Sequence, residues 1–290
     1  MTPNEPRLTR DQQREATREK ARQLREQHKR QETNKKVWIR VAVVVGLLAV
    51  IGGVTLSIVQ GASNKNKAGS APANLIYNDG IKIGKGLEAF TTTNTPAPNP
   101  TSSVSADGSV PNIIMYVDYQ CPVCQAFEMS NAEQIRKWVE SGAATVEIHP
   151  ISFLDGRASP NTYSSRAANA ALCVANYSPN NYFKFSSLLF ENQPAENTAG
   201  PENPELIQRI KDAGVVTTPD LTNCVNNKTF GKWLTDTTKT ALTEKVPGTD
   251  LTVDGTPFVV VNGQKYSWTT GEELTSPARF AQFVQMAAKL

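Results

Sequence analysis

The sequence NIIMYVDYQCPVC, residues 112–124, places two cysteines directly after a short apolar run. The run from Asn112 to Tyr119 has the length and the hydrophobic character of a strand, and the residues after it repeat apolar side chains at helical spacing. Pro122 suits the first position of a helix, because its missing N–H would be unpaired there and its ring fixes φ. Cys121 and Cys124 are therefore predicted at a helix N-terminus, where the helix dipole and free N–H groups stabilise a thiolate.

This placement predicts a redox-active dithiol. Cys121 lies at the outer end of the helix, so we expect its thiol to be the attacking one, with Cys124 resolving the mixed disulfide. Glu128 follows Cys124 by four positions and shares its helix face, which makes it a candidate acceptor for the Cys124 proton. A plain surface carboxylate is the alternative for Glu128, and Asp118 is a second candidate for the acceptor role.

Zinc sites also use a C-x-x-C motif, but they need two further ligands. The remaining cysteines, Cys173 and Cys224, are 51 positions apart, and His149 is the only histidine beyond residue 40. This spacing does not fit a zinc site, so no metal is expected. Both cysteines fall in helical patterns, and we expect a structural disulfide between them; a second redox relay is the alternative.

A second half of the site is predicted near the C-terminus. Thr256 and Pro257 precede the strand-like run Phe258 to Val261, which ends at an Asn-Gly turn. A cis Thr256–Pro257 bond would turn the Thr256 backbone toward Cys121, where it can pair with a substrate chain. An ordinary proline at the start of a strand is the alternative.

The other segments complete an α/β layout. Thr145 to Phe153 is a predicted strand, a helical region runs from about 159 to 246, and a last helix runs from Pro277 to Leu290. Upstream, Leu75 to Ile83 carries a hairpin signal at residues 78–80, and residues 91–109 form a Pro-rich loop or insertion. The order strand, helix, strand, helical insertion, strand pair, helix predicts a thioredoxin fold with an inserted α-helical subdomain.

The N-terminal region indicates a membrane anchor. Residues 1–40 hold twelve Lys or Arg against six Asp or Glu, so the basic pI of the chain is no indication of nucleic-acid binding. Val41 to Val59 is 19 residues without a charge, enough to cross a bilayer core of about 30 Å. Seven Lys or Arg between Arg22 and Arg40 favour a cytoplasmic N-terminus.

We therefore expect four parts along the chain. These are a cytoplasmic charged arm (1–36), one transmembrane helix (37–60), a linker (61–74) and an extracytoplasmic domain (75–290). All four cysteines fall in the last part, which fits an oxidising compartment. A cleaved signal peptide is the alternative to the retained anchor, although its apolar region is normally shorter.

The stretch Val117 to Glu128, together with Thr256–Pro257, resembles the DsbA-like family, especially the membrane-anchored extracytoplasmic members of Gram-positive bacteria. The resemblance spans about residues 75–290. It implies a protein that donates a disulfide to exported cysteine-containing proteins. A membrane enzyme of the DsbB or vitamin K epoxide reductase type would then reoxidise it. Members of this kind carry an extra cysteine pair in the helical subdomain, which supports pairing Cys173 with Cys224.

The sequence departs from the family pattern at Val123, where strongly oxidising relatives often have His. Thr256 also occurs before the cis proline of relatives that isomerise disulfides. We expect an oxidase, because the sequence contains no dimerisation domain of the isomerase kind, and a monomer without metal or organic cofactor. A reductase or isomerase is the first alternative, and a noncatalytic binding or chaperone module is the second.

Overall fold

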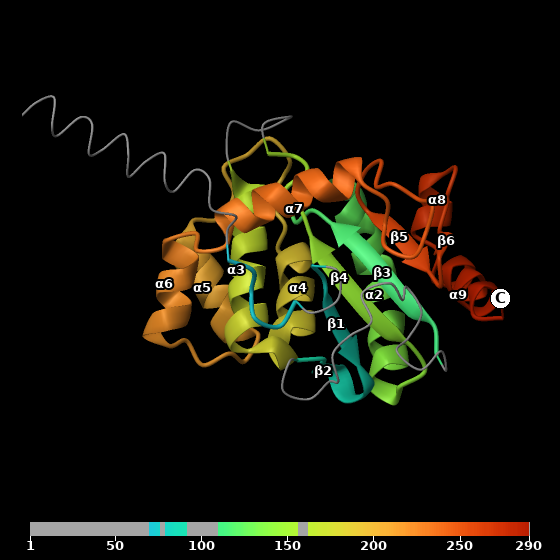
Figure 1. The fold of residues 1–290 in the computed structure, drawn as a ribbon, viewed down its shortest axis with the longest axis horizontal. Helices are drawn as coiled ribbons and strands as arrows, with labels where there is room; N and C mark the ends of the chain where they lie inside the picture. Colours follow the sequence, from blue (N-terminus) through green and yellow to red (C-terminus); the bar gives the residue numbers. More distant parts are fainter. Residues whose placement is uncertain (1–69, 76–78, 92–109, 156–161, 290) are drawn as a thin grey trace, which may run out of the picture. The chain divides into compact units, whose positions relative to one another are not determined.

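The computed structural model describes residues 70–75, 79–91, 110–155 and 162–289 (Figure 1). The expected charged arm and membrane span lie outside these residues. Among the helices that the structure does describe, none combines the length and the apolar character needed to cross a membrane.

In these residues six strands form one mixed sheet in the order β2-β1-β4-β3-β5-β6. The strands are β1 (Ile81–Gly84), β2 (Glu88–Ala89), β3 (Asn112–Val117), β4 (Thr145–Pro150), β5 (Phe258–Val261) and β6 (Gln264–Lys265). Strand β3 runs parallel to β4 and antiparallel to β5. Every residue of β3 is buried, which explains why Ile113 to Val117 is an unbroken apolar run rather than an alternating one.

The two faces of β3 belong to two apolar clusters. Ile113, Met115 and Val117 face the main core, while Ile114 and Tyr116 face a smaller cluster on the other side of the sheet. This alternation follows from the two-residue period of a strand. Residues near the end of α7 (Gly231–Thr243) pack against the smaller cluster. The sheet is therefore covered on both faces, with β3 at its centre.

Within the described residues, β1 and β2 form a hairpin downstream of the turn signal at residues 78–80. Strand β1 pairs with β2 across the short 3-10 turn η1 (Lys85–Leu87), with Ile83 opposite Ala89, and Gly86 takes the left-handed conformation at φ 73°. At the expected site, residues 76–78 are outside the described ranges. Asp79, inside the predicted turn, has a positive φ of 69°, and Gly80 allows close packing, since a Cβ there would lie 2.5 Å from Nε2 of His149.

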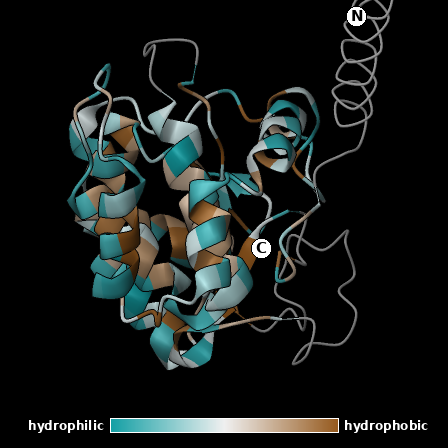
Figure 2. Cartoon of the chain, turned by 90° about the vertical axis from the view of Figure 1, so that its left-hand side faces the viewer, coloured by the Kyte–Doolittle hydropathy of each residue, from teal (hydrophilic) through white to brown (hydrophobic). Residues whose placement is uncertain are grey.

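The predicted helical region forms a bundle beside the sheet (Figure 1). Its members are α3 (Tyr163–Tyr177), the 3-10 turn η2 (Pro179–Asn181), α4 (Tyr182–Glu191), α5 (Asn203–Asp212), α6 (Pro219–Asn226) and α7. Helix α3 is the central one, because most of its residues are buried and its alanines let neighbouring helices approach closely. Figure 2 shows hydrophobic and hydrophilic residues mixed along the helices of the bundle, as expected when each helix buries one face.

Two further helices follow the sheet, α8 (Gly271–Leu274) and α9 (Pro277–Ala287). The α9 helix matches the predicted C-terminal one. Its Phe280 ring packs edge-on against Phe127 at a centroid distance of 5.2 Å. Because Phe127 belongs to the helix that carries the two cysteines, this contact fixes that helix against the end of the chain.

Candidate active site

The two cysteines lie at the start of α2 (Pro122–Ser141), which directly follows β3. Cys121 is the N-cap, with extended backbone angles of φ −76° and ψ 117°, and Pro122 occupies the first helical turn. The Cys121 carbonyl accepts the first helical hydrogen bond, from the Gln125 N–H at 3.1 Å. The structure confirms the predicted placement of both thiols at a helix N-terminus.

The two thiols have different environments. Both are free, but Cys121 keeps 6% of its surface exposed, whereas Cys124 is fully buried. A hydrogen bond from the Cys124 thiol lowers the pKa of Cys121 to about 6, and the Thr256 side chain and the N–H groups of Cys124 and Val123 act in the same direction against burial. Burial raises the pKa of Cys124 well above its ordinary value. The site can therefore hold one ionised and one neutral sulfur at neutral pH.

The Thr256–Pro257 segment lies beside Cys121, as predicted. The peptide bond between them is cis, and the Cys121 thiol contacts the Thr256 carbonyl oxygen at 3.3 Å. This hydrogen bond exists only while Cys121 is protonated, because a thiolate has no hydrogen to donate. Pro257 leads directly into β5, so the sheet fixes the position of this segment.

Asp118 is a buried carboxylate that holds the loop before α2. One of its oxygens accepts hydrogen bonds from the Gln120 N–H (2.8 Å) and the Ser164 hydroxyl (2.7 Å), and the other accepts from the Leu154 N–H (2.9 Å). Burial raises its pKa to about 6 against these donors. The carboxylate thereby links the cysteine loop to the chain after β4 and to α3.

Glu128 is also buried rather than a surface carboxylate. Only 8% of the residue is exposed, and burial raises its pKa to about 7. It contributes to a cavity of about 10 Å³ together with Met115 and Ser186, and it also lines an open apolar groove between α2 and α4. Ser186 bonds the Tyr119 hydroxyl at 3.0 Å. The predicted proton acceptor therefore lies between the protein interior and the surface.

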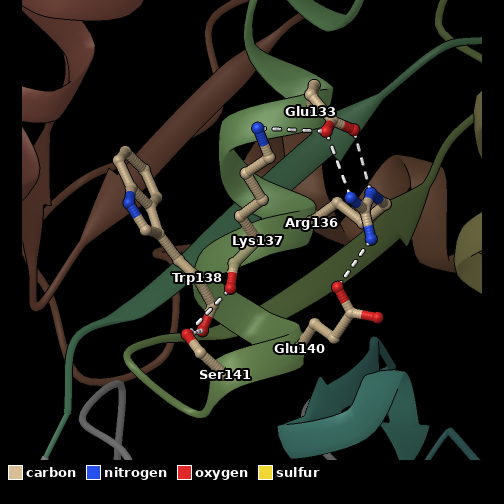
Figure 3. Close-up of polar contacts among 6 residues, drawn as sticks. All are labelled: Glu133, Arg136, Lys137, Trp138, Glu140 and Ser141. Atoms are coloured by element: carbon tan, nitrogen blue, oxygen red, sulfur yellow. Dashed lines mark hydrogen bonds and ion pairs between the residues drawn. The ribbon is translucent and has the colours of Figure 1, made fainter.

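The outer face of α2 carries charges that pair with one another along the helix (Figure 3). Arg136 bridges Glu133 at 2.9 Å and Glu140 at 2.6 Å, and Lys137 pairs with Glu133 at 3.3 Å. These side chains are exposed or half-buried, and pairs of this kind contribute little to stability. They distinguish the solvent face of α2 from the face that carries Cys124, Phe127 and Glu128.

The other cysteines and the histidine lie away from the dithiol. Cys173 of α3 and Cys224 of α6 form a disulfide, with an S–S distance of 2.06 Å. His149 contacts Glu147 at 2.8 Å and stacks on Tyr116, whose side chain belongs to the smaller cluster. Among the described residues, no group of three or more His, Cys, Asp or Glu is arranged to hold a metal ion.

Sequence reasoning missed a set of glutamines around the motif. Gln193, in the loop between α4 and α5, donates to the Cys121 carbonyl oxygen at 3.0 Å. Gln120 and Gln125, which flank the motif, donate to carbonyls on either side of Gln193. No local pattern reveals these contacts, because Gln193 is 72 positions from Cys121.

Fold and site together define a thioredoxin-like protein with a dithiol at the start of a helix and a cis proline beside it. A family model described as Thioredoxin matches residues 106–284, and the chain belongs to this family.

Two solved structures from Mycobacterium tuberculosis share 27% sequence identity with the chain and superpose with a TM-score of 0.54. One is the reduced form of the disulfide bond oxidoreductase DsbG (72% of this chain, 87% of that one), and the other is oxidised DsbA (72% and 93%). BdbD from Bacillus subtilis, at 17% identity and a TM-score of 0.54, covers 78% of this chain and 100% of its own. At that identity the likeness supports the fold alone.

Curated relatives match a shorter part of the chain. The serine/threonine-protein kinase PknE of Mycobacterium tuberculosis is 35% identical over 158 residues, which is 51% of this chain and 27% of the kinase. The chain therefore corresponds to about a quarter of the length of these relatives.

Proposed function

We propose that this chain is a protein thiol:disulfide oxidoreductase that oxidises cysteines of exported proteins through Cys121 and Cys124. The observation that carries the proposal is the placement of the two thiols: Cys121 caps the start of α2 beside the cis Thr256–Pro257 bond, and Cys124 is fully buried behind it. This placement lowers the pKa of Cys121 to about 6 and raises that of Cys124. A thiol of low pKa is both a stable thiolate and a good leaving group.

The reaction begins with the oxidised Cys121–Cys124 pair. A substrate thiolate attacks the Cys121 sulfur, the bond between the two cysteines breaks, and Cys124 leaves and takes up a proton. A second substrate thiolate then attacks the substrate sulfur of the mixed disulfide, and Cys121 leaves as a thiolate. The substrate loses two electrons and two protons as its disulfide forms. The Cys121–Cys124 disulfide accepts the two electrons and becomes the dithiol. Glu128 is the proposed proton carrier for Cys124.

The proposed direction follows from the pKa of Cys121. A stable thiolate favours the reduced dithiol, so its disulfide is a stronger oxidant. A value of about 6 lies between roughly 7 for thioredoxin and roughly 3.5 for DsbA. We therefore expect a reduction potential between about −270 mV, as in thioredoxin, and about −120 mV, as in DsbA. The Val123 side chain, which cannot donate a hydrogen bond, is consistent with an intermediate value.

We further propose the location and the partner. The apolar segment 41–59 anchors the protein in the cell membrane with its N-terminus in the cytoplasm, and the catalytic domain lies outside. A membrane enzyme of the DsbB or vitamin K epoxide reductase type returns the dithiol to the disulfide. The uncharged length of the segment and the basic residues before it support this topology.

Trapping tests the proposal. The Cys124→Ala variant retains the attacking sulfur but cannot resolve a mixed disulfide, so it should accumulate covalent adducts with exported proteins and with the regenerating enzyme. The Cys121→Ser variant is the control and should form none. A potential near −270 mV would instead favour a reductase. If Cys121→Ser kept full cellular activity, the protein would be a noncatalytic binding module.

A further inference from the structure

The backbone of Cys121 is held by a side chain from the helical bundle. Gln193 donates from Nε2 to the Cys121 carbonyl oxygen at 3.0 Å, and the same oxygen accepts the Gln125 N–H at 3.1 Å. A carbonyl oxygen has two lone pairs, so these two donors satisfy it. The reactive turn is thus fixed by its own helix and by a residue that follows α4.

The segment that carries Gln193 is in turn held by the residues around the dithiol. We call residues 192–202, between α4 and α5, the Gln193 loop. The Gln125 amide donates to the carbonyl of Phe190, just before this loop, at 2.9 Å. The Gln120 amide, which is almost fully buried, donates to the carbonyl of Thr198 at 2.9 Å. The loop therefore has a fixed position on both sides of Gln193.

The two sides of Cys121 differ in what they present. The Gln193 loop supplies a donor that acts on the Cys121 backbone, while the Thr256 carbonyl oxygen lies 3.3 Å from the sulfur. The carbonyl oxygen carries partial negative charge, which disfavours a neighbouring thiolate, whereas the Thr256 side chain acts in the opposite direction and lowers the pKa of Cys121. A donor bound to the Cys121 carbonyl offsets part of the negative charge that Cys121 itself places near its sulfur.

We propose that Gln193 is a positioning residue for the disulfide exchange, holding the Cys121 peptide so that its sulfur stays at the helix N-terminus and its thiolate is favoured. This inference rests on the proposed function, because the acidity of Cys121 matters only if that sulfur reacts. It assigns to the segment after α4 a part in positioning the reactive turn, through one amide.

Three substitutions at Gln193 separate the donor from the packing. Gln193→Met keeps the length of the side chain and removes the donor, so we expect the pKa of Cys121 to rise by about 0.5. Gln193→Glu removes the donor and adds a negative charge, so a larger rise of about 1 is expected. Gln193→Lys retains a donor and should leave the pKa at or below its original value. Thiolate absorbance against pH measures all three.

Gln208 provides the matched control. It is exposed on α5, and its amide donates to Asp212 rather than to the cysteine turn. Gln208→Met and Gln208→Glu should leave the pKa of Cys121 unchanged. We also expect the second step, in which Cys121 leaves the mixed disulfide, to slow about twofold in the Gln193→Met protein, with little change in thermal unfolding.

The order of the three variants decides the inference. If Met, Glu and Lys at position 193 all gave the same Cys121 pKa, Gln193 would be a packing residue and the inference would be wrong, even in variants of altered stability. That outcome would leave the proposed function intact, provided that the unsubstituted protein exchanges disulfides. An unsubstituted protein with an ordinary Cys121 thiol and no exchange would instead remove the proposed function itself.

Discussion

Side chains of one chemical type behave differently at and along α2 because their burial and their hydrogen-bond partners differ. Cys121 and Cys124 are three positions apart, yet one thiol is made more acidic and the other less acidic. Glu128 and Glu133 show the same contrast for carboxylates. Burial raises the pKa of Glu128 to about 7, whereas hydrogen bonds from Arg136 and Lys137 lower the pKa of Glu133 to about 2.

The raised pKa of Glu128 predicts a loss of stability with rising pH. The unfolded chain ionises this carboxyl near 4.5, but the folded protein does so only near 7, so folding disfavours the charged form. The stability that neutral Glu128 gives the folded protein is therefore fully present below pH 4.5 and is lost as the pH rises through 7. The unfolding free energies of the unsubstituted protein and of Glu128→Gln are compared at each pH. Between pH 4 and pH 8, we expect the value for the unsubstituted protein to fall by roughly 3 kcal/mol more than the value for Glu128→Gln.

Urea unfolding of the oxidised proteins across this pH range measures the difference without titration of the cysteines. Glu133→Gln is the control. The pKa of Glu133 is lowered below its ordinary value of 4.5, so the effect of this substitution on the unfolding free energy should be constant from pH 5 to pH 8. Parallel stability curves for Glu128→Gln and the unsubstituted protein would mean that Glu128 ionises normally in the fold.

Sequence reasoning found the residues that depend on local order and missed those that depend on packing. The helix start at Cys121 and the segment at Thr256 follow from proline chemistry and from neighbouring strands, so short motifs predict them. Helical spacing placed Glu128 near Cys124 but left its burial open, since burial depends on what α4 brings against α2. Gln193 had no signal, because its partner lies in a distant segment.

The C-terminal end of helix α2 is defined by its C-cap residue, Gly142. Gly142 takes the left-handed conformation at φ 80°, and its N–H donates to the Val139 carbonyl at 3.0 Å. The next residue, Ala143, donates to the Trp138 carbonyl at 2.7 Å. These bonds satisfy the last carbonyls of the helix, and the chain can then enter β4. A side chain at position 142 would be strained in this conformation, and its Cβ would lie 3.2 Å from the side chain of Lys85.

Gly142→Ala should therefore lower the unfolding free energy by about 1 kcal/mol. Gly271→Ala is the control, because Gly271 begins α8 without a left-handed conformation and a Cβ there meets nothing within 4 Å. We expect that variant to be neutral or slightly more stable. Thermal unfolding compares the two, and equal effects would show that conformation at position 142 does not limit stability.

The elements most accurately predicted are those with a strong periodic or apolar pattern. Strand β3, helix α2 and the helical bundle lie where the sequence places them, because burial imposes their hydrophobic pattern. The hairpin expected at residues 78–80 stays a prediction, because residues 76–78 are outside the described ranges, whereas the pairing of β1 with β2 and β4 is decided by the sheet. Strand β2, at two residues, is too short to give a pattern of its own.

At the scale of the whole molecule, the disulfide joins parts of the bundle that are distant in sequence. Cys173 lies in the central helix α3 and Cys224 in α6, and both are buried. Asn169, one turn before Cys173, donates to the Cys224 carbonyl at 3.3 Å and accepts the Phe230 N–H at 2.9 Å. The bond and this amide thus connect α3, α6 and the start of α7 independently of the dithiol.

Replacing both cysteines by alanine should separate stability from exchange. The bond closes a sequence separation of 51 residues, for which the chain-entropy model gives about 4 kcal/mol of unfolding free energy. We expect Cys173→Ala/Cys224→Ala to lose about this much in urea unfolding, while the pKa of Cys121 and its rate of exchange at low temperature stay unchanged. A redox relay would give the reverse result, with stability nearly kept and turnover lost. Because the single variants leave one free thiol, the double variant is the appropriate comparison, and its activity measured well below its melting temperature distinguishes the two roles.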